Sequence, residues 1–160
     1  MKFRVEREVL AEALGAAARV ASTRNNAMPA LSGVKLEVTG DQLTLSCTDN
    51  DLSVQFVLPV GGQADGVVVA SAKLLSDIVR AGADGKVTFE SAGEEVHISS
   101  GRAQTTVATF AASDFPHIAL ASAPPVTLSA PLLGEALRQV VRAASSDMQR
   151  LPLTGVLMSA

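Results

Sequence analysis

Features that would narrow the function at once are scarce in this sequence of 160 residues. Cys47 is its one cysteine, which excludes an intramolecular disulfide and fits a reducing compartment. No run approaches the ~20 apolar residues that a membrane-spanning helix needs. The first stretch, MKFRVEREVL, has no apolar segment of the kind found in secretory signals. We therefore expect a soluble cytoplasmic protein with no membrane partner.

An excess of positive charge is also missing. The chain has 13 Lys and Arg against 16 Asp and Glu, a net charge of −3, so no global positive field attracts nucleic acid. A basic face on one side of the molecule is still compatible with these numbers. With 48% hydrophobic residues the chain can bury a core, and its length suits one domain, or one domain plus a piece.

The sequence lacks a constellation for catalysis or metal binding. His97 and His117 lie far apart, with no carboxylate or thiol at ligand spacing. Asp49 and Asp51, in TDND, are more typical of a tight turn between strands. The stretches GGQADG and GADG lack the Lys-Ser/Thr pair of a phosphate-binding loop. Cys47 falls on the apolar side of its segment, which predicts a buried side chain. We predict no enzyme activity, no metal and no cofactor.

What the sequence does have is a repeated order of elements. The first series is a strand at 3–5, an amphipathic helix at about 7–21, and alternating strands at 33–38, 42–47 and 52–58. After a loop at 61–66 the second series follows, with a strand at 67–70, a helix at 72–82 capped by Ser71, and strands at 86–91, 95–100 and 102–109. This order predicts an α+β fold of duplicated β-α-β-β-β units, with the helices on one side of curved antiparallel sheets.

Each predicted helix has an apolar stripe that should face the core. The stripes comprise Val9, Leu10, Ala13, Leu14, Ala17 and Ala21 in the first helix, and Leu74, Leu75, Ile78 and Val79 in the second. The opposite faces carry basic residues mixed with acids. Arg7 and Arg19 lie on the first helix, and Lys73 and Arg80 on the second. Such a face suits loose phosphate contact.

A third copy begins after a polar, proline-bearing linker at 111–125. VTLSAPLLGEALRQVVRAASS aligns with FRVEREVLAEALGAAARVAST, which pairs Glu12 with Glu135 and Arg19 with Arg142. Matches at apolar and charged positions alike indicate that a whole domain is repeated. We predict a complete domain over 1–120, followed over 121–160 by a linker and the first β-α-β part of a truncated second domain.

Several blocks together resemble one family. MKFRVERE, LSGVKLEV with LTLSCTDNDLSV, SGRAQTTVATFAASDFPHI and RLPLTGV are similar, in order and spacing, to the bacterial DNA polymerase III β subunit, the sliding clamp. The resemblance implies three similar domains per subunit and a dimeric ring around duplex DNA. It implies a DNA replication processivity factor, with the replicative polymerase and the clamp loader as partners. The family is often classed under DNA-directed DNA polymerase, a nucleotidyltransferase (transferase) activity, but the clamp itself performs no chemistry.

The resemblance also implies functional residues. We expect sequence-independent DNA contacts from Arg24, Asn25, Lys73, Arg80, Gln149 and Arg150. We expect the ring joint at Lys73, Leu74, Ile78 and Thr106, and part of a partner-peptide cleft at Arg150, Leu153 and Thr154. Two functions fit: a processivity factor, here as a truncated chain that does not close a ring alone, or a protein–protein module that binds the ring-joint face of a full-length clamp.

Overall fold

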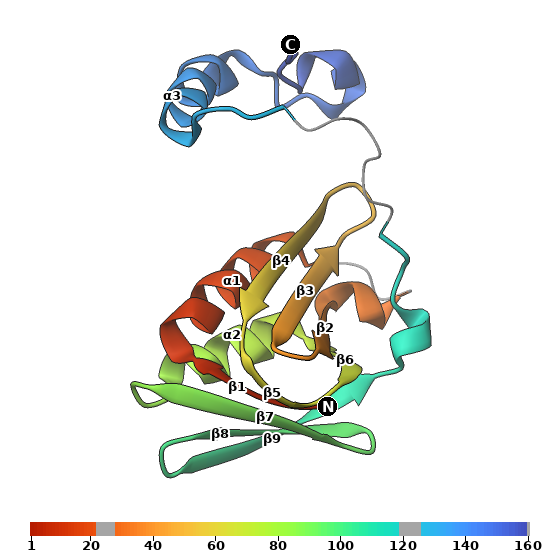
Figure 1. Ribbon diagram of the computed structural model, residues 1–160. Coiled ribbons are helices and arrows are strands. Elements are labelled where there is room, and N and C mark those ends of the chain that lie inside the picture. The colour runs from red at the N-terminus through yellow and green to blue at the C-terminus, as the bar shows by residue number, and fades with distance from the viewer. Residues whose placement is uncertain (22–27, 119–125, 160) are drawn as a thin grey trace. The chain divides into compact units, whose positions relative to one another are not determined.

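The computed structural model describes residues 1–21, 28–118 and 126–159 (Figure 1). The chain forms two compact units, Met1–Ala119 and Leu120–Ala160. Every strand among the described residues belongs to the first unit. In the same part of the chain, no helix combines the length and apolar character needed to cross a membrane.

The elements follow the predicted order. The first unit comprises β1 (Lys2–Glu6), α1 (Arg7–Val20), the 3-10 helix η1 (Pro29–Ser32), β2 (Gly33–Thr39), β3 (Gln42–Thr48), β4 (Ser53–Pro59), β5 (Gly61–Ala64), β6 (Gly66–Ser71), α2 (Ala72–Ala81), β7 (Lys86–Ala92), β8 (Glu95–Ser100), β9 (Ala103–Phe110) and the 3-10 helix η2 (Ala112–Asp114). The second unit has α3 (Ala130–Val140) and the 3-10 helices η3 (Val141–Ala143) and η4 (Met148–Leu153).

The two halves of the first unit exchange their first strands. The sheet order is β4-β3-β2-β6-β9-β8-β7-β1-β5, with every neighbouring pair antiparallel. β1 pairs with β7 of the second half, and β6 pairs with β2 of the first half. Each half therefore supplies the strand that completes the other half's sheet. The predicted duplication of β-α-β-β-β units in an α+β fold is confirmed.

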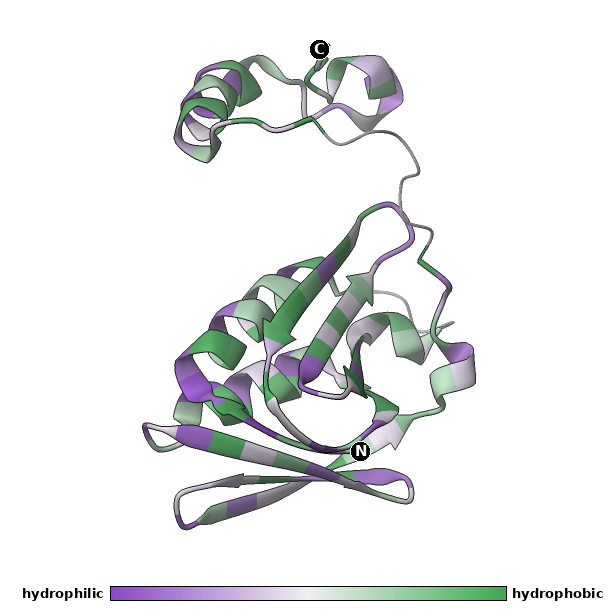
Figure 2. Cartoon of the chain, in the orientation of Figure 1, coloured by the Kyte–Doolittle hydropathy of each residue, from purple (hydrophilic) through white to green (hydrophobic). Residues whose placement is uncertain are grey.

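Both helices pack on one side of this curved sheet, as predicted, and lie side by side in Figure 1. α1 buries Leu10, Ala13, Leu14 and Ala17 toward β3 and β4. Figure 2 shows β3 and β7 alternating between hydrophobic and hydrophilic residues, which is why only one face of each strand enters the core.

The apolar stripes predicted for α1 and α2 each included one residue that does not face the core. Val9 is 42% exposed and Leu74 is 52% exposed, because each lies about 100° around its helix from the buried leucine that follows it. α2 buries Leu75 and Val79 instead. The side chain of Ser71 caps α2 as predicted, accepting a hydrogen bond from the backbone N–H of Leu74 at 3.4 Å.

Turn chemistry explains the aspartates between β3 and β4. The Oδ1 atom of Asp49 accepts hydrogen bonds from the backbone N–H groups of Asp51, at 3.1 Å, and Leu52, at 2.8 Å. Asn50, between them, has a φ of 81°, a left-handed conformation that asparagine tolerates better than most residues. The prediction of a turn at TDND is confirmed.

β5 corrects the prediction of a loop over 61–66. Its sequence, GGQA, has no β-branched residue, so its pattern does not indicate a strand. Hydrogen bonds to Asp41, in the turn between β2 and β3, hold this segment in place. The N–H of Val60 donates to the carbonyl of Asp41 at 2.9 Å, and the N–H of Gly62 donates to Oδ1 of Asp41 at 3.0 Å. A Cβ atom at Gly62 would overlap the carbonyl of Gly40, so only glycine allows this approach.

The second unit differs from its prediction. α3 confirms a helix there, but residues 126–129 and 155–159 form no strands. A strand needs a hydrogen-bonded neighbour, and no other described segment of this unit supplies one. Leu133 and Leu137 are only half-buried, and Leu132 is 69% exposed. The apolar stripe of α3 is therefore largely uncovered within its own unit.

Candidate nucleic-acid interface

The outer face of the α1–α2 pair is the candidate interface. The two helices carry four basic residues, Arg7, Arg19, Lys73 and Arg80, and three acidic ones, Glu8, Glu12 and Asp77. Their net charge is therefore +1, in a chain whose net charge is −3. The acidic excess of the chain therefore lies outside these two helices.

Arg80 reaches from α2 onto α1. A Cβ atom at Gly15 would overlap Nη2 of Arg80, so the absence of a side chain at Gly15 lets the guanidinium lie against the backbone of α1. Neither Arg80 nor the exposed Arg19 forms an ion pair with another described residue. Both charges are available to an anion.

The other two basic residues of the pair are engaged. Nζ of Lys73 lies 2.9 Å from Oδ2 of Asp77, and both side chains are more than half exposed. Such a pair contributes only about 0.3–0.5 kcal/mol, so a phosphate can replace the carboxylate.

Arg7 was expected on the exposed side of α1, and this was wrong. Only 17% of its side chain is exposed, and its Nη2 atom lies 2.6 Å from Oδ1 of Asp84. The backbone N–H of Arg7 also donates to the carbonyl of Gly85 at 2.8 Å. These contacts tie the start of α1 to the loop before β7, so Arg7 holds the fold together rather than presenting a free charge.

The residues expected at a ring joint fall on α2 and β9. Leu74 is exposed and Ile78 half-buried on α2. On β9, the hydroxyl of Thr106 lies 2.9 Å from Nδ1 of His97. Residues 103–108 of β9 pair with β8, and β6 joins only at Thr109 and Phe110. Within the described residues the second edge of β9 is thus open over most of its length, a surface suited to strand addition.

The remaining predicted residues lie in two places. Arg24 and Asn25 fall outside the described residues. Gln149, Arg150 and Leu153 belong to η4, and Thr154 follows it. The carboxylate of Asp147 accepts from the backbone N–H of Gln149 at 3.0 Å and lies 3.8 Å from Nε of Arg150. The structure therefore brings four predicted residues of the second unit into one short turn.

Cys47 is fully buried, as predicted. Its Sγ atom lies 3.4 Å from the carbonyl oxygens of Ala17 and Gly33. Burial raises the pKa of this thiol to about 11, so it is not poised as a nucleophile. Among the described residues, no three or more His, Cys, Asp or Glu side chains are grouped so that they could hold a metal ion.

A helix pair on one side of a sheet built from two halves that exchange their first strands defines a DNA-clamp domain. Residues 1–119 match the DNA polymerase III beta subunit, N-terminal domain, and the chain belongs to this family. It is 35% identical over 158 residues to the beta sliding clamp of Streptomyces coelicolor and 32% identical over 156 residues to that of Micrococcus luteus. These alignments cover 98% of this chain but 41% and 50% of those proteins.

A solved structure gives the same result. The chain superimposes on Caulobacter crescentus pol III beta with a TM-score of 0.89 and 29% identity, covering 97% of this chain and 42% of that one. The chain thus spans about half the length of the relatives it matches. The close approach of Arg80 to Gly15 is a feature that the sequence patterns do not reveal, because a glycine inside a helix gives no sign of what packs on it.

Proposed function

We propose that this chain is part of a sliding clamp, a non-catalytic DNA replication processivity factor that encircles duplex DNA and tethers the replicative polymerase. The observation that carries this is the α1–α2 face, where the exposed side chains of Arg19 and Arg80 form no ion pair with another described residue. In a ring this face would point toward the DNA. We further propose that residues 1–120 are a complete clamp domain and that 121–160 begin the next one.

Loose contact suits this role. The face offers few cations, and acids lie among them, so phosphates are attracted without being fixed. The contacts proposed for this face are to phosphates, and phosphate contacts carry no sequence information. Recognition should therefore be independent of sequence and sensitive to salt.

Self-association would use the open edge of β9. Thr106 on that strand, and Lys73, Leu74 and Ile78 on α2, are proposed to meet a clamp domain of another subunit. The same open edge also favours the second candidate, a module that binds the ring-joint face of a full-length clamp. Arg150, Leu153 and Thr154 are proposed as part of a cleft for polymerase and clamp-loader peptides.

Neutralising the unpaired helix charges should weaken DNA binding. In Arg19→Gln/Arg80→Gln, two phosphate contacts are lost, so the slope of log K against log salt should become shallower by about 1.8. Fluorescence anisotropy with two unrelated duplexes at several salt concentrations measures this. Arg4→Gln/Arg102→Gln removes the same charge from exposed sites outside the helices and should keep the slope. A strong preference for one duplex, or the same loss in both variants, would contradict the assignment.

The segments that follow α1 and α3 allow a second test of the proposed DNA contacts. Arg24→Ala/Arg150→Ala, with Gln149→Ala added, should lower the affinity for both duplexes by the same factor, since these residues are proposed to touch phosphate only. The titration is repeated at the lowest salt concentration, where electrostatic contacts contribute most. Unchanged binding would remove these loops from the proposed interface and leave the helix face as its only part.

A further inference from the structure

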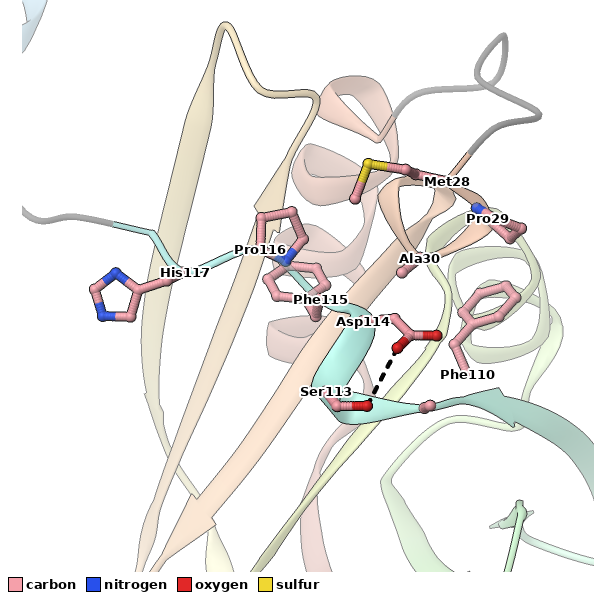
Figure 3. Close-up of a pocket in the computed structure, with 10 residues that line it drawn as sticks. Met28, Pro29, Ala30, Phe110, Ser113, Asp114, Phe115, Pro116 and His117 are labelled. Carbon is pink, nitrogen blue, oxygen red and sulfur yellow. Dashed lines mark hydrogen bonds between the residues drawn. The ribbon is translucent and has the colours of Figure 1, made fainter.

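A hollow of about 760 Å³ lies where β9 ends (Figure 3). Its lining is largely apolar and includes Met28, Ala30, Phe110, Phe115 and Pro116, with Asp114 among them. Two of the five phenylalanines of the chain thus face a surface hollow rather than the core. Its size is within the range of sites that bind small molecules or short peptide segments.

The aromatic walls are held by the fold. Phe110 is the last residue of β9 and pairs with Val69 of β6. A Cβ atom at Gly33 would come within 3.1 Å of Cδ2 of Phe110 and 2.8 Å of Cγ1 of Val69, so glycine at this position makes room for the ring. Phe115 follows η2, and its backbone N–H donates to the carbonyl of Ala112 at 3.3 Å. The hollow is therefore a built feature of the first unit.

The charge at the hollow is negative. Asp114 accepts a hydrogen bond from Oγ of Ser113 at 3.2 Å and forms no ion pair with any described residue. Two aromatic rings beside an unpaired carboxylate complement a long basic side chain. The aliphatic stem packs on apolar surface, and the cation meets the carboxylate and the ring faces.

We propose that this hollow binds a short segment of a partner protein that carries an apolar residue followed by an arginine. The arginine contacts Asp114, Phe110 and Phe115, and the apolar residue lies beside Met28. None of these residues belongs to the proposed DNA face, ring joint or peptide cleft. The site is thus additional to the proposed function and does not depend on it.

The probe is N-acetyl-leucyl-arginine amide, titrated to millimolar concentration into the full chain and followed by the backbone amide signals of residues 110–117. The chemical shift changes should saturate and be largest for this probe. They should be smaller when the arginine of the probe is replaced by glutamine and absent when it is replaced by glutamate. Asp114→Asn should weaken binding by roughly three- to fivefold, the scale of one exposed ion pair. Asp51→Asn, which removes an exposed carboxylate elsewhere, should leave it unchanged.

Filling the hollow gives an independent check. Ser113→Trp changes an exposed residue of the lining and should abolish the shifts while the far-UV circular dichroism stays native. Three results would overturn the proposal: no shifts with any probe, equal affinity for the arginine and glutamate analogues, or binding unaffected by Asp114→Asn. Concentration-dependent dimerisation that Ser113→Trp abolishes would instead assign the hollow to a second copy of the chain.

Discussion

Phe89→Ala is expected to lower the free energy of unfolding by about 3–5 kcal/mol, the range for removing a fully buried phenylalanine. Phe89 and Phe3 are both fully buried, and their rings stack with centroids 5.0 Å apart. The two residues face each other in the β1–β7 register, where the two halves are joined by their exchanged strands. The substitution removes this contact and opens a cavity at the seam between the halves.

Urea unfolding followed by far-UV circular dichroism measures this loss, since the chain has no tryptophan or tyrosine to report it by fluorescence. Phe115→Ala is the matched control, because Phe115 is only half-buried and lies at the surface hollow. Phe115→Ala should lower the free energy of unfolding by less than about 1.5 kcal/mol, since Phe115 buries less apolar surface than Phe89 does. Equal losses for the two variants would show that the stacked pair is not the centre of the core.

Alkylation of Cys47 by iodoacetamide at pH 8 should be at least about 100-fold slower in the folded chain than in urea. Burial raises the pKa of this thiol from 9.0 to about 11, which reduces the reactive thiolate at pH 8 by about 100-fold. The side chain is also inaccessible to the reagent. Mass spectrometry of timed samples gives both rates. Labelling within a factor of ten of the unfolded rate would mean that the site between α1 and β3 opens readily.

The same thiol makes stability depend on pH in the alkaline range. Below about pH 9 Cys47 is protonated in both the folded and the unfolded chain, so its contribution is constant. Between about pH 9 and pH 11 the unfolded chain ionises first, which favours unfolding, so stability falls as the pH rises. Cys47→Ala, measured beside the parent chain, should show a smaller fall over this range.

Most helices and strands of the first unit could be predicted from the sequence, because its strands have one solvent-exposed and one buried face. The alternation Val34, Leu36, Val38 in β2 and the caps and turns at Ser71 and Asp49 depend on neighbours close in sequence. β5 could not be predicted, because its sequence has no strand pattern and Gly62 is held by Asp41, which lies 21 residues earlier in the sequence. The exchange of β1 and β6 is likewise a matter of pairing between distant segments, which periodicity does not encode.

The candidate interface was predictable in outline only. Helical spacing placed Lys73, Arg80 and Arg19 on outer faces, but it did not show that Asp84 would hold Arg7 or that Asp77 would pair with Lys73. In the second unit the helix was predictable from its repeat of α1. The strands predicted on either side of that helix do not form, because an extended segment becomes a strand only when a neighbouring segment pairs with it.

The exchange of first strands has a consequence for synthesis on the ribosome. β1 is made first, yet both of its neighbours, β5 and β7, lie beyond residue 60. At about 5–20 residues per second, the nascent chain carries the apolar face of α1 and an unpaired β1 for several seconds. The first half cannot mature while the second is untranslated, so we expect the emerging chain to need shielding by a chaperone until β7 has left the exit tunnel.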